Sequence, residues 1–148
     1  MRIDIPLVED NDGGIRLMRE ILCEINSAAR LHVVTNGLEG MLYLGYQGRY
    51  RDAPRPSVIL LDVNLPRMHS HEVLTGVKAN PHLRAIPVIV LTSSEADSDV
   101  ASSYQLMANR YLRKPGNWNQ FEEMVKGLNR FWFTRAKLPK QKQSVGPR

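Results

Sequence analysis

Acidic, hydroxyl and amine side chains stand directly after short apolar runs of this chain. Glu9 and Asp10 follow the first run, Asp62 ends the third, Thr92 follows the fourth, and Lys114 comes after the last. If these runs are parallel strands of one sheet, their carboxyl ends meet at a single edge, where open α/β sheets bind their ligands. We therefore expect the five side chains to converge in one crevice.

Such a set of groups suits phosphoryl transfer. Three carboxylates in one crevice repel each other unless they share a cation, and oxygen ligands suit Mg²⁺ rather than zinc. An amine and a hydroxyl beside that cation supply the charge neutralisation and the hydrogen bonds that a transferring phosphoryl group needs. A carboxylate can act as the nucleophile by forming an aspartyl phosphate, and Asp62 is the candidate. An isolated aspartate after a strand more often only opens the next turn, so the case for Asp62 rests on its neighbours.

The apolar patterns predict the elements that position these side chains. Short apolar runs predict strands at 3–8, 31–35, 57–62, 87–91 and 111–112, and helical spacing predicts helices near 14–26, 38–44, 73–80, 100–107 and 121–132. Strands that alternate with helices predict an α/β fold with a doubly wound parallel sheet. Asp12 is the expected cap of the first helix. Pro6 is awkward inside a strand, because proline lacks the N–H that a sheet ladder uses.

Length and charge restrict the class of protein. A chain of 148 residues is expected to form one domain, with a folded body over 1–134 that ends in an extended helix and a basic, disordered tail over 135–148. Six of the 20 basic residues lie from Arg130 onward without any acid, which leaves 14 basic and 15 acidic residues before them. Nucleic-acid binding by the folded body is therefore not expected, and neither is a membrane span. Without an export signal, we expect a cytoplasmic location.

Four motifs resemble the receiver domain of two-component response regulators. They are Glu9-Asp10-Asn11, Leu61-Asp62-Val63-Asn64-Leu65-Pro66, Leu91-Thr92-Ser93 and Tyr111-Leu112-Arg113-Lys114-Pro115. They occur in the order and register of that family and extend the resemblance from residue 3 to about residue 133. The resemblance implies a flavodoxin-like fold, with five parallel strands in the order 2-1-3-4-5.

The resemblance also implies a phosphorylation reaction and a metal site. Asp62 would accept a phosphoryl group from the phosphohistidine of a histidine kinase, with Mg²⁺ as the cofactor. Asp10, Asp62 and the backbone carbonyl of Asn64 would bind the metal directly, and Glu9 would help through water. The chain would then be a phosphoacceptor that promotes its own phosphorylation and dephosphorylation, and not an enzyme with a separate substrate.

Further residues of the motifs would carry the switch. Lys114 would contact the phosphoryl oxygens, and its bond to Pro115 would be cis. Thr92 would turn inward to hydrogen-bond the phosphate, Tyr111 would follow it from an exposed to a buried position, and the small Ser93 would leave the phosphoryl path open. A downstream protein or a phosphotransfer partner would read the changed surface.

A narrower resemblance is to the small regulators paired with bacterial phytochromes. It rests on Gly48-Arg49-Tyr50, Pro54-Arg55-Pro56, Asn80-Pro81-His82-Leu83, Arg130-Phe131-Trp132-Phe133 and Leu138-Pro139. Those regulators are single receivers and often homodimers, and their kinase is a phytochrome. Three consecutive aromatic residues cannot all face one side of a helix, so we expect Phe131, Trp132 and Phe133 to take part in a homodimer contact.

Two departures from the receiver pattern keep other functions open. The family has Asp-Gly where this chain has His69-Ser70, and Pro6 replaces a strand residue. A receiver-like docking or dimerisation module that no longer switches is therefore the alternative. An aspartyl phosphatase is disfavoured because Asn64 stands where such enzymes have a second acid. Nucleic-acid binding through the tail would need strongly salt-dependent retention of DNA.

Overall fold

The computed structural model describes residues 2–63, 70–92 and 108–133. The strands are β1 (Ile3–Val8), β2 (Ala29–Val34), β3 (Ile59–Asp62), β4 (Val88–Thr92) and β5 (Arg110–Arg113). The helices are α1 (Asp12–Ile25), α2 (Gly37–Leu44), α3 (Ser70–Ala79) and α5 (Trp118–Leu128), with a 3₁₀ turn (Gly48–Tyr50) and a π-helical turn (Asn129–Phe133). The predicted helix at 100–107 and the predicted tail lie outside the described residues.

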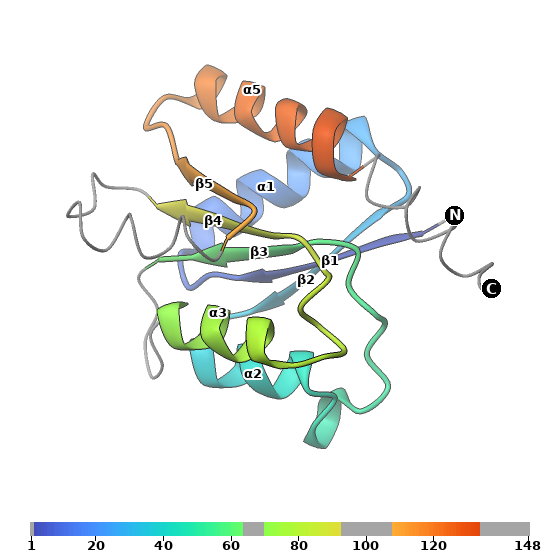
Figure 1. Ribbon diagram of the computed structural model, residues 1–148. Helices are drawn as coiled ribbons and strands as arrows, with labels where there is room; N and C mark the ends of the chain where they lie inside the picture. Colours follow the sequence, from blue (N-terminus) through green and yellow to red (C-terminus); the bar gives the residue numbers. More distant parts are fainter. Residues whose placement is uncertain (1, 64–69, 93–107, 134–148) are drawn as a thin grey trace.

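The five strands form one sheet in the order β2-β1-β3-β4-β5, and all the pairs are parallel. This confirms the predicted flavodoxin-like architecture. Figure 1 shows α1 and α5 on one face of the sheet and α2 and α3 on the other. The strand bounds agree with the apolar runs to within about two residues. In β3 and β4 this follows because a strand covered on both faces is apolar along most of its length.

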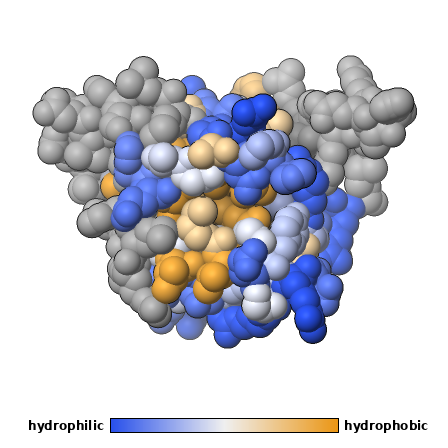
Figure 2. Space-filling model, turned by 60° about the horizontal axis from the view of Figure 1, so that its bottom comes forward, coloured by the Kyte–Doolittle hydropathy of each residue, from blue (hydrophilic) through white to orange (hydrophobic). Residues whose placement is uncertain are grey.

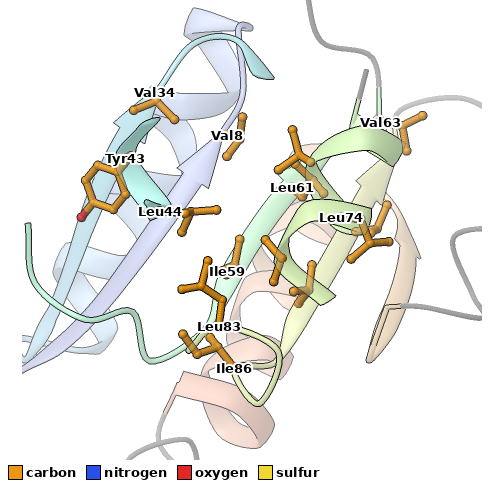
Figure 3. Packing of buried hydrophobic residues seen from close by; sticks show 14 residues of the cluster. Val8, Val34, Tyr43, Leu44, Ile59, Leu61, Val63, Leu74, Leu83 and Ile86 are labelled. Carbon is orange, nitrogen blue, oxygen red and sulfur yellow. The ribbon is translucent and has the colours of Figure 1, made fainter. Parts of the chain in front are cut away.

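Alternate side chains of each strand enter one of two cores. Ile3, Ile5 and Leu7 of β1 pack under α1 and α5, whereas Val8 packs under α2 and α3. Figure 3 shows the second core, where Leu61 of β3 and Leu74 of α3 meet beneath the helix. Both cores hold the central strands rigidly, so the residues at the carboxyl ends of these strands are placed with little freedom.

The outer side of α2 remains apolar. Leu38, Met41 and Leu42 are half-buried, since one side of α2 packs on the sheet and the other side reaches the surface. Figure 2 shows hydrophobic residues gathered in the middle of this side of the molecule, with hydrophilic residues around them. None of the helices in the described ranges combines the length and the apolar character that crossing a membrane requires.

Asparagine caps begin three of the described helices. The side chain of Asn11 accepts a hydrogen bond from the N–H of Gly14, and Asn36 and Asn117 make the equivalent bonds at α2 and α5. The expectation that Asp12 caps the first helix was therefore wrong. Asn11 takes that place because its backbone is extended, whereas Asp12 is already the first helical residue.

Pro6 lies inside β1 and affects only one of its two neighbours. The carbonyl of Asp4 accepts from Ser57 N at 2.8 Å, so the even-numbered residues of β1 face β3. Pro6 therefore lacks its N–H on the β3 side. The β1–β2 pairing runs along the whole strand, but the β1–β3 pairing covers only Leu7 and Val8.

Candidate functional site

Two strand ends bring the three predicted acidic residues together. Glu9 and Asp10 directly follow β1, and Asp62 is the last residue of β3, whose Leu61 pairs with Val8. One carboxylate oxygen each of Glu9, Asp10 and Asp62 lies within 4.8 Å of the other two. Glu9 and Asp62 are buried and Asp10 is exposed, so the cluster has one open side.

Lys114 reaches the same crevice from the end of β5. Its Nζ donates to Glu9 Oε1 at 2.7 Å and lies 3.5 Å from Asp62 Oδ1. Thr92, the last residue of β4, is buried at 1 % exposure, and its carbonyl accepts from the backbone N of Lys114. The side chains of Glu9, Asp10, Asp62 and Lys114 thus lie together, whereas the placement of the Thr92 hydroxyl in the crevice stays a prediction. Lys114 pairs with Glu9 more closely than with Asp62.

The electrostatics of the crevice leave Asp62 short of positive charge. Burial, and then the neighbouring charge of Glu9, raise the pKa of the Asp62 carboxyl from 3.8 to about 6. Lys114 opposes this rise by its charge and by hydrogen bonding, but it does not cancel the combined effect of burial and the neighbouring acids. A site with this imbalance gains from a further cation.

The described residues fit a hard divalent cation. The donor set consists of carboxylate oxygens, and the exposed position of Asp10 leaves room for water on one side. Asn64, the expected carbonyl ligand, lies outside the described residues, as do Ser93 and His69. The acidic part of the predicted metal site is therefore present as a cluster.

The predicted cis bond between Lys114 and Pro115 was wrong. No peptide bond in the described ranges is cis. The trans form is the lower-energy state of a bond that precedes proline, unless the surrounding fold selects the other isomer. Tyr111, expected to be exposed before phosphorylation, is half-buried, with its ring against the core beneath α2 and α3.

The structure separates the three consecutive aromatic residues. Phe133 is fully buried beneath α1 and α5, Trp132 packs partly against the same core, and Phe131 is 58 % exposed. The expectation that Phe133 takes part in a dimer contact was wrong, because the π-helical turn directs its side chain into the core. Phe131 is the most exposed of these three aromatic residues.

Two features of the site were missed from the sequence. A groove of about 710 Å³ lies beside Lys114, between the first turns of α1 and the start of α5, and is lined by Leu17, Pro115 and Phe121 among others. Ser70, interpreted only as the loss of a glycine, donates a buried hydrogen bond to the carbonyl of Val63, next to Asp62. A serine at the start of a helix often bonds to nearby backbone, which was the available signal.

The family is decided by a match to the model of the response regulator receiver domain, which covers residues 5–126. The chain belongs to this receiver family. Response regulator Rcp1 from Synechocystis sp. (strain ATCC 27184 / PCC 6803 / Kazusa) is 43% identical over 135 residues, which are 91% of this chain and 92% of that protein.

Solved receivers of similar sequence have the same fold. The phosphorylated cyanobacterial phytochrome response regulator RcpA superposes with a TM-score of 0.83 at 42% identity, over 89% of this chain and 94% of that one. The Mn(2+)-bound form of Rcp1 gives 0.82 at 43% identity, over 88% and 94%. The second of these structures holds a divalent metal, in agreement with the acidic cluster of this receiver.

Proposed function

We propose that this receiver is a phosphorylation-switched response regulator that accepts a phosphoryl group on Asp62 from the phosphohistidine of a histidine kinase. The observation that carries the proposal is the buried carboxylate of Asp62, with the Lys114 ammonium 3.5 Å away and Glu9 and Asp10 beside it. A purely structural aspartate would not need a cluster of acids that raises its own pKa.

Each side chain has a role in this reaction. Asp62 Oδ attacks phosphorus, the N–P bond of the phosphohistidine breaks, and the imidazole leaves with the electron pair and takes up a proton. Lys114, freed in part from Glu9, neutralises charge on the phosphoryl oxygens, and Thr92 offers its hydroxyl to the product. Asp10 and Asp62 would hold Mg²⁺ directly, and Glu9 would help through water. The bound ion would neutralise the negative charge on the phosphoryl oxygens.

The phosphoryl group also supplies the switch. It adds a charge of about −1.5 to −2 and strong acceptor oxygens at the end of β3. Thr92 belongs to β4 and Tyr111 to β5. The two strands are paired, with Val90 opposite Tyr111, so a shift of β4 at Thr92 would also displace β5 at Tyr111. We propose that a downstream protein or a phosphotransfer partner reads the altered surface along β5.

The kinase that we propose is a phytochrome. The support is the similarity to RcpA, described as a cyanobacterial phytochrome response regulator, over nearly the whole of both chains. The groove beside Lys114 gives a large partner access to the crevice. Phosphotransfer from a purified phytochrome kinase should be at least tenfold faster than from an unrelated histidine kinase, and equal rates would exclude this pairing.

Phosphorylation itself is tested with a small acyl phosphate. After incubation with acetyl phosphate and Mg²⁺, intact-mass measurement should detect a phosphate adduct in the wild type and none in Asp62→Asn. Asp52→Asn, which removes an exposed carboxylate in the connection before β3, should form the adduct normally. If no adduct forms at any Mg²⁺ concentration, the proposal fails, and the alternative of a docking or dimerisation module that no longer switches is favoured.

A further inference from the structure

The first residue of α3 is bonded back to the residue that follows Asp62. Ser70 is fully buried, and its hydroxyl donates to the carbonyl oxygen of Val63. On its other side, the N–H of Val63 donates to the carbonyl of Leu91 at 2.9 Å, as the last bond between β3 and β4. The backbone next to Asp62 is therefore held from two sides, by β4 and by α3.

The bond from Ser70 is a property of this chain and not of the receiver pattern. That pattern has glycine where Ser70 stands, and glycine has no hydroxyl to donate. The carbonyl of Val63 is in a buried residue with 9 % exposure, where an unpaired acceptor is costly. The serine therefore adds a specific constraint at the position where the receiver pattern has its most flexible residue.

We propose that Ser70 is a positioning residue, whose bond to Val63 holds the Asp62 carboxylate in register with Glu9 and Asp10 for cation binding and phosphorylation. This rests on the proposed function of the crevice. Asp62 is on β3 whereas Glu9 and Asp10 follow β1, and the last β1–β3 pair is Val8 with Leu61. Beyond that pair, the bonds of Val63 to Leu91 and Ser70 hold the backbone on the far side of Asp62.

The bond should act through preorganisation. With Ser70 in place, the ordering of the backbone at Val63 is completed when the protein folds. Without the hydroxyl, part of that ordering must occur when the cation binds, and the affinity falls accordingly. One net hydrogen bond corresponds to about a fivefold change in affinity, which is roughly 1 kcal/mol.

The test compares the Mg²⁺ dissociation constants of folded proteins by titration calorimetry. Ser70→Ala should bind Mg²⁺ about fivefold more weakly than the wild type and form the acyl-phosphate adduct more slowly. Thr75→Ala is the matched control, because Thr75 Oγ1 donates to His71 O at 2.9 Å in the same helix but at an exposed position. Ser70→Gly, the residue of the receiver pattern, gives a second variant if Ser70→Ala fails to fold.

The outcomes separate this inference from the proposed function. Mg²⁺ affinities of folded Ser70→Ala and Ser70→Gly within twofold of the wild type would overturn the role of Ser70, even if the wild type forms its adduct. If the Ser70 variants bind Mg²⁺ fivefold more weakly but the wild type forms no phosphate adduct, the proposed phosphorylation is overturned. The role of Ser70 in positioning Asp62 for cation binding then still stands. A loss of thermal stability alone, with unchanged affinity, would make Ser70 structural only.

Discussion

Asp62 shows at the scale of one residue why the crevice is a site and not only a turn. Its carboxylate is buried beside Glu9, and its nearest positive charge, Lys114, is shared with that acid. The ionised form therefore lacks both water and a full counter-charge, which raises the pKa of Asp62 to about 6. Carboxylates with such a raised pKa cluster at functional sites, which agrees with a role for Asp62 in the crevice.

The raised pKa of Asp62 predicts how stability depends on pH when no metal is present. The carboxyl releases its proton near pH 3.8 in the unfolded chain and near pH 6 in the folded one. Between these values the folded state binds more protons, so the contribution of Asp62 to the free energy of unfolding falls as the pH rises and is constant above about pH 7. The total fall is on the order of 2–3 kcal/mol.

Urea unfolding in EDTA checks this at several pH values. Asp62→Asn should be more stable than the wild type at pH 8, and the difference should shrink toward pH 4. Asp52→Asn should keep the pH dependence of the wild type, since its exposed carboxylate lies before β3. A difference between Asp62→Asn and the wild type that stays constant with pH would contradict the prediction.

At the scale of elements, much of the fold could be predicted from the apolar runs and the helical spacing of the sequence. The buried strands are nearly continuous apolar runs, and Glu9, Asp62, Thr92 and Lys114 stand at or just after strand ends. Both the sheet and the edge that carries the acidic cluster could therefore be predicted from the sequence. What was missed depends on contacts between distant segments. The bond of Ser70 to Val63 is set by how the chain packs, and so is the burial of Phe133 in preference to its neighbours.

Two helical glycines give a prediction at this scale, because they differ in the space around them. A Cβ at Gly127 of α5 would meet nothing within 4 Å, so Gly127→Ala should raise the free energy of unfolding by about 0.5–1 kcal/mol. A Cβ at Gly40 of α2 would lie 3.3 Å from both methyl carbons of Val8, a fully buried and branched residue. Gly40→Ala should therefore lower stability by roughly 1 kcal/mol.

Chemical denaturation of the two variants beside the wild type measures both effects. The comparison cancels the gain in helix propensity, which the two substitutions share. Equal changes in the two proteins would mean that α2 can move away from β1 without cost, contrary to the close packing in the core beneath α2 and α3.

At the scale of the whole molecule, the acidic crevice and the exposed Phe131 lie near opposite ends of α5. This helix begins near the edge of the sheet that carries the acidic cluster and runs back to the opposite edge (Figure 1). Trp118 at its start is 55 % exposed, and Phe131, just past its end, is 58 % exposed. A contact between two copies through Phe131 would leave the acidic crevice and the groove beside Lys114 open to the proposed kinase.

The last prediction concerns that contact. We expect the protein to form a homodimer in which Phe131 of each copy is buried. Each ring contributes about 1.5 kcal/mol or more when it leaves water, and a two-fold symmetric contact counts it twice. Phe131→Ala should thus raise the dimer dissociation constant by roughly two orders of magnitude.

Sedimentation velocity over a range of concentrations measures this change, and Trp118→Ala is the matched control. It removes an equally exposed aromatic residue from the other end of α5 and should leave the dimer intact. Both variants should form the acyl-phosphate adduct, because neither residue belongs to the acidic cluster. The prediction is contradicted if Phe131→Ala sediments like the wild type, or if the wild type is a monomer at every concentration. Phe131 would then be an exposed side chain that makes no dimer contact.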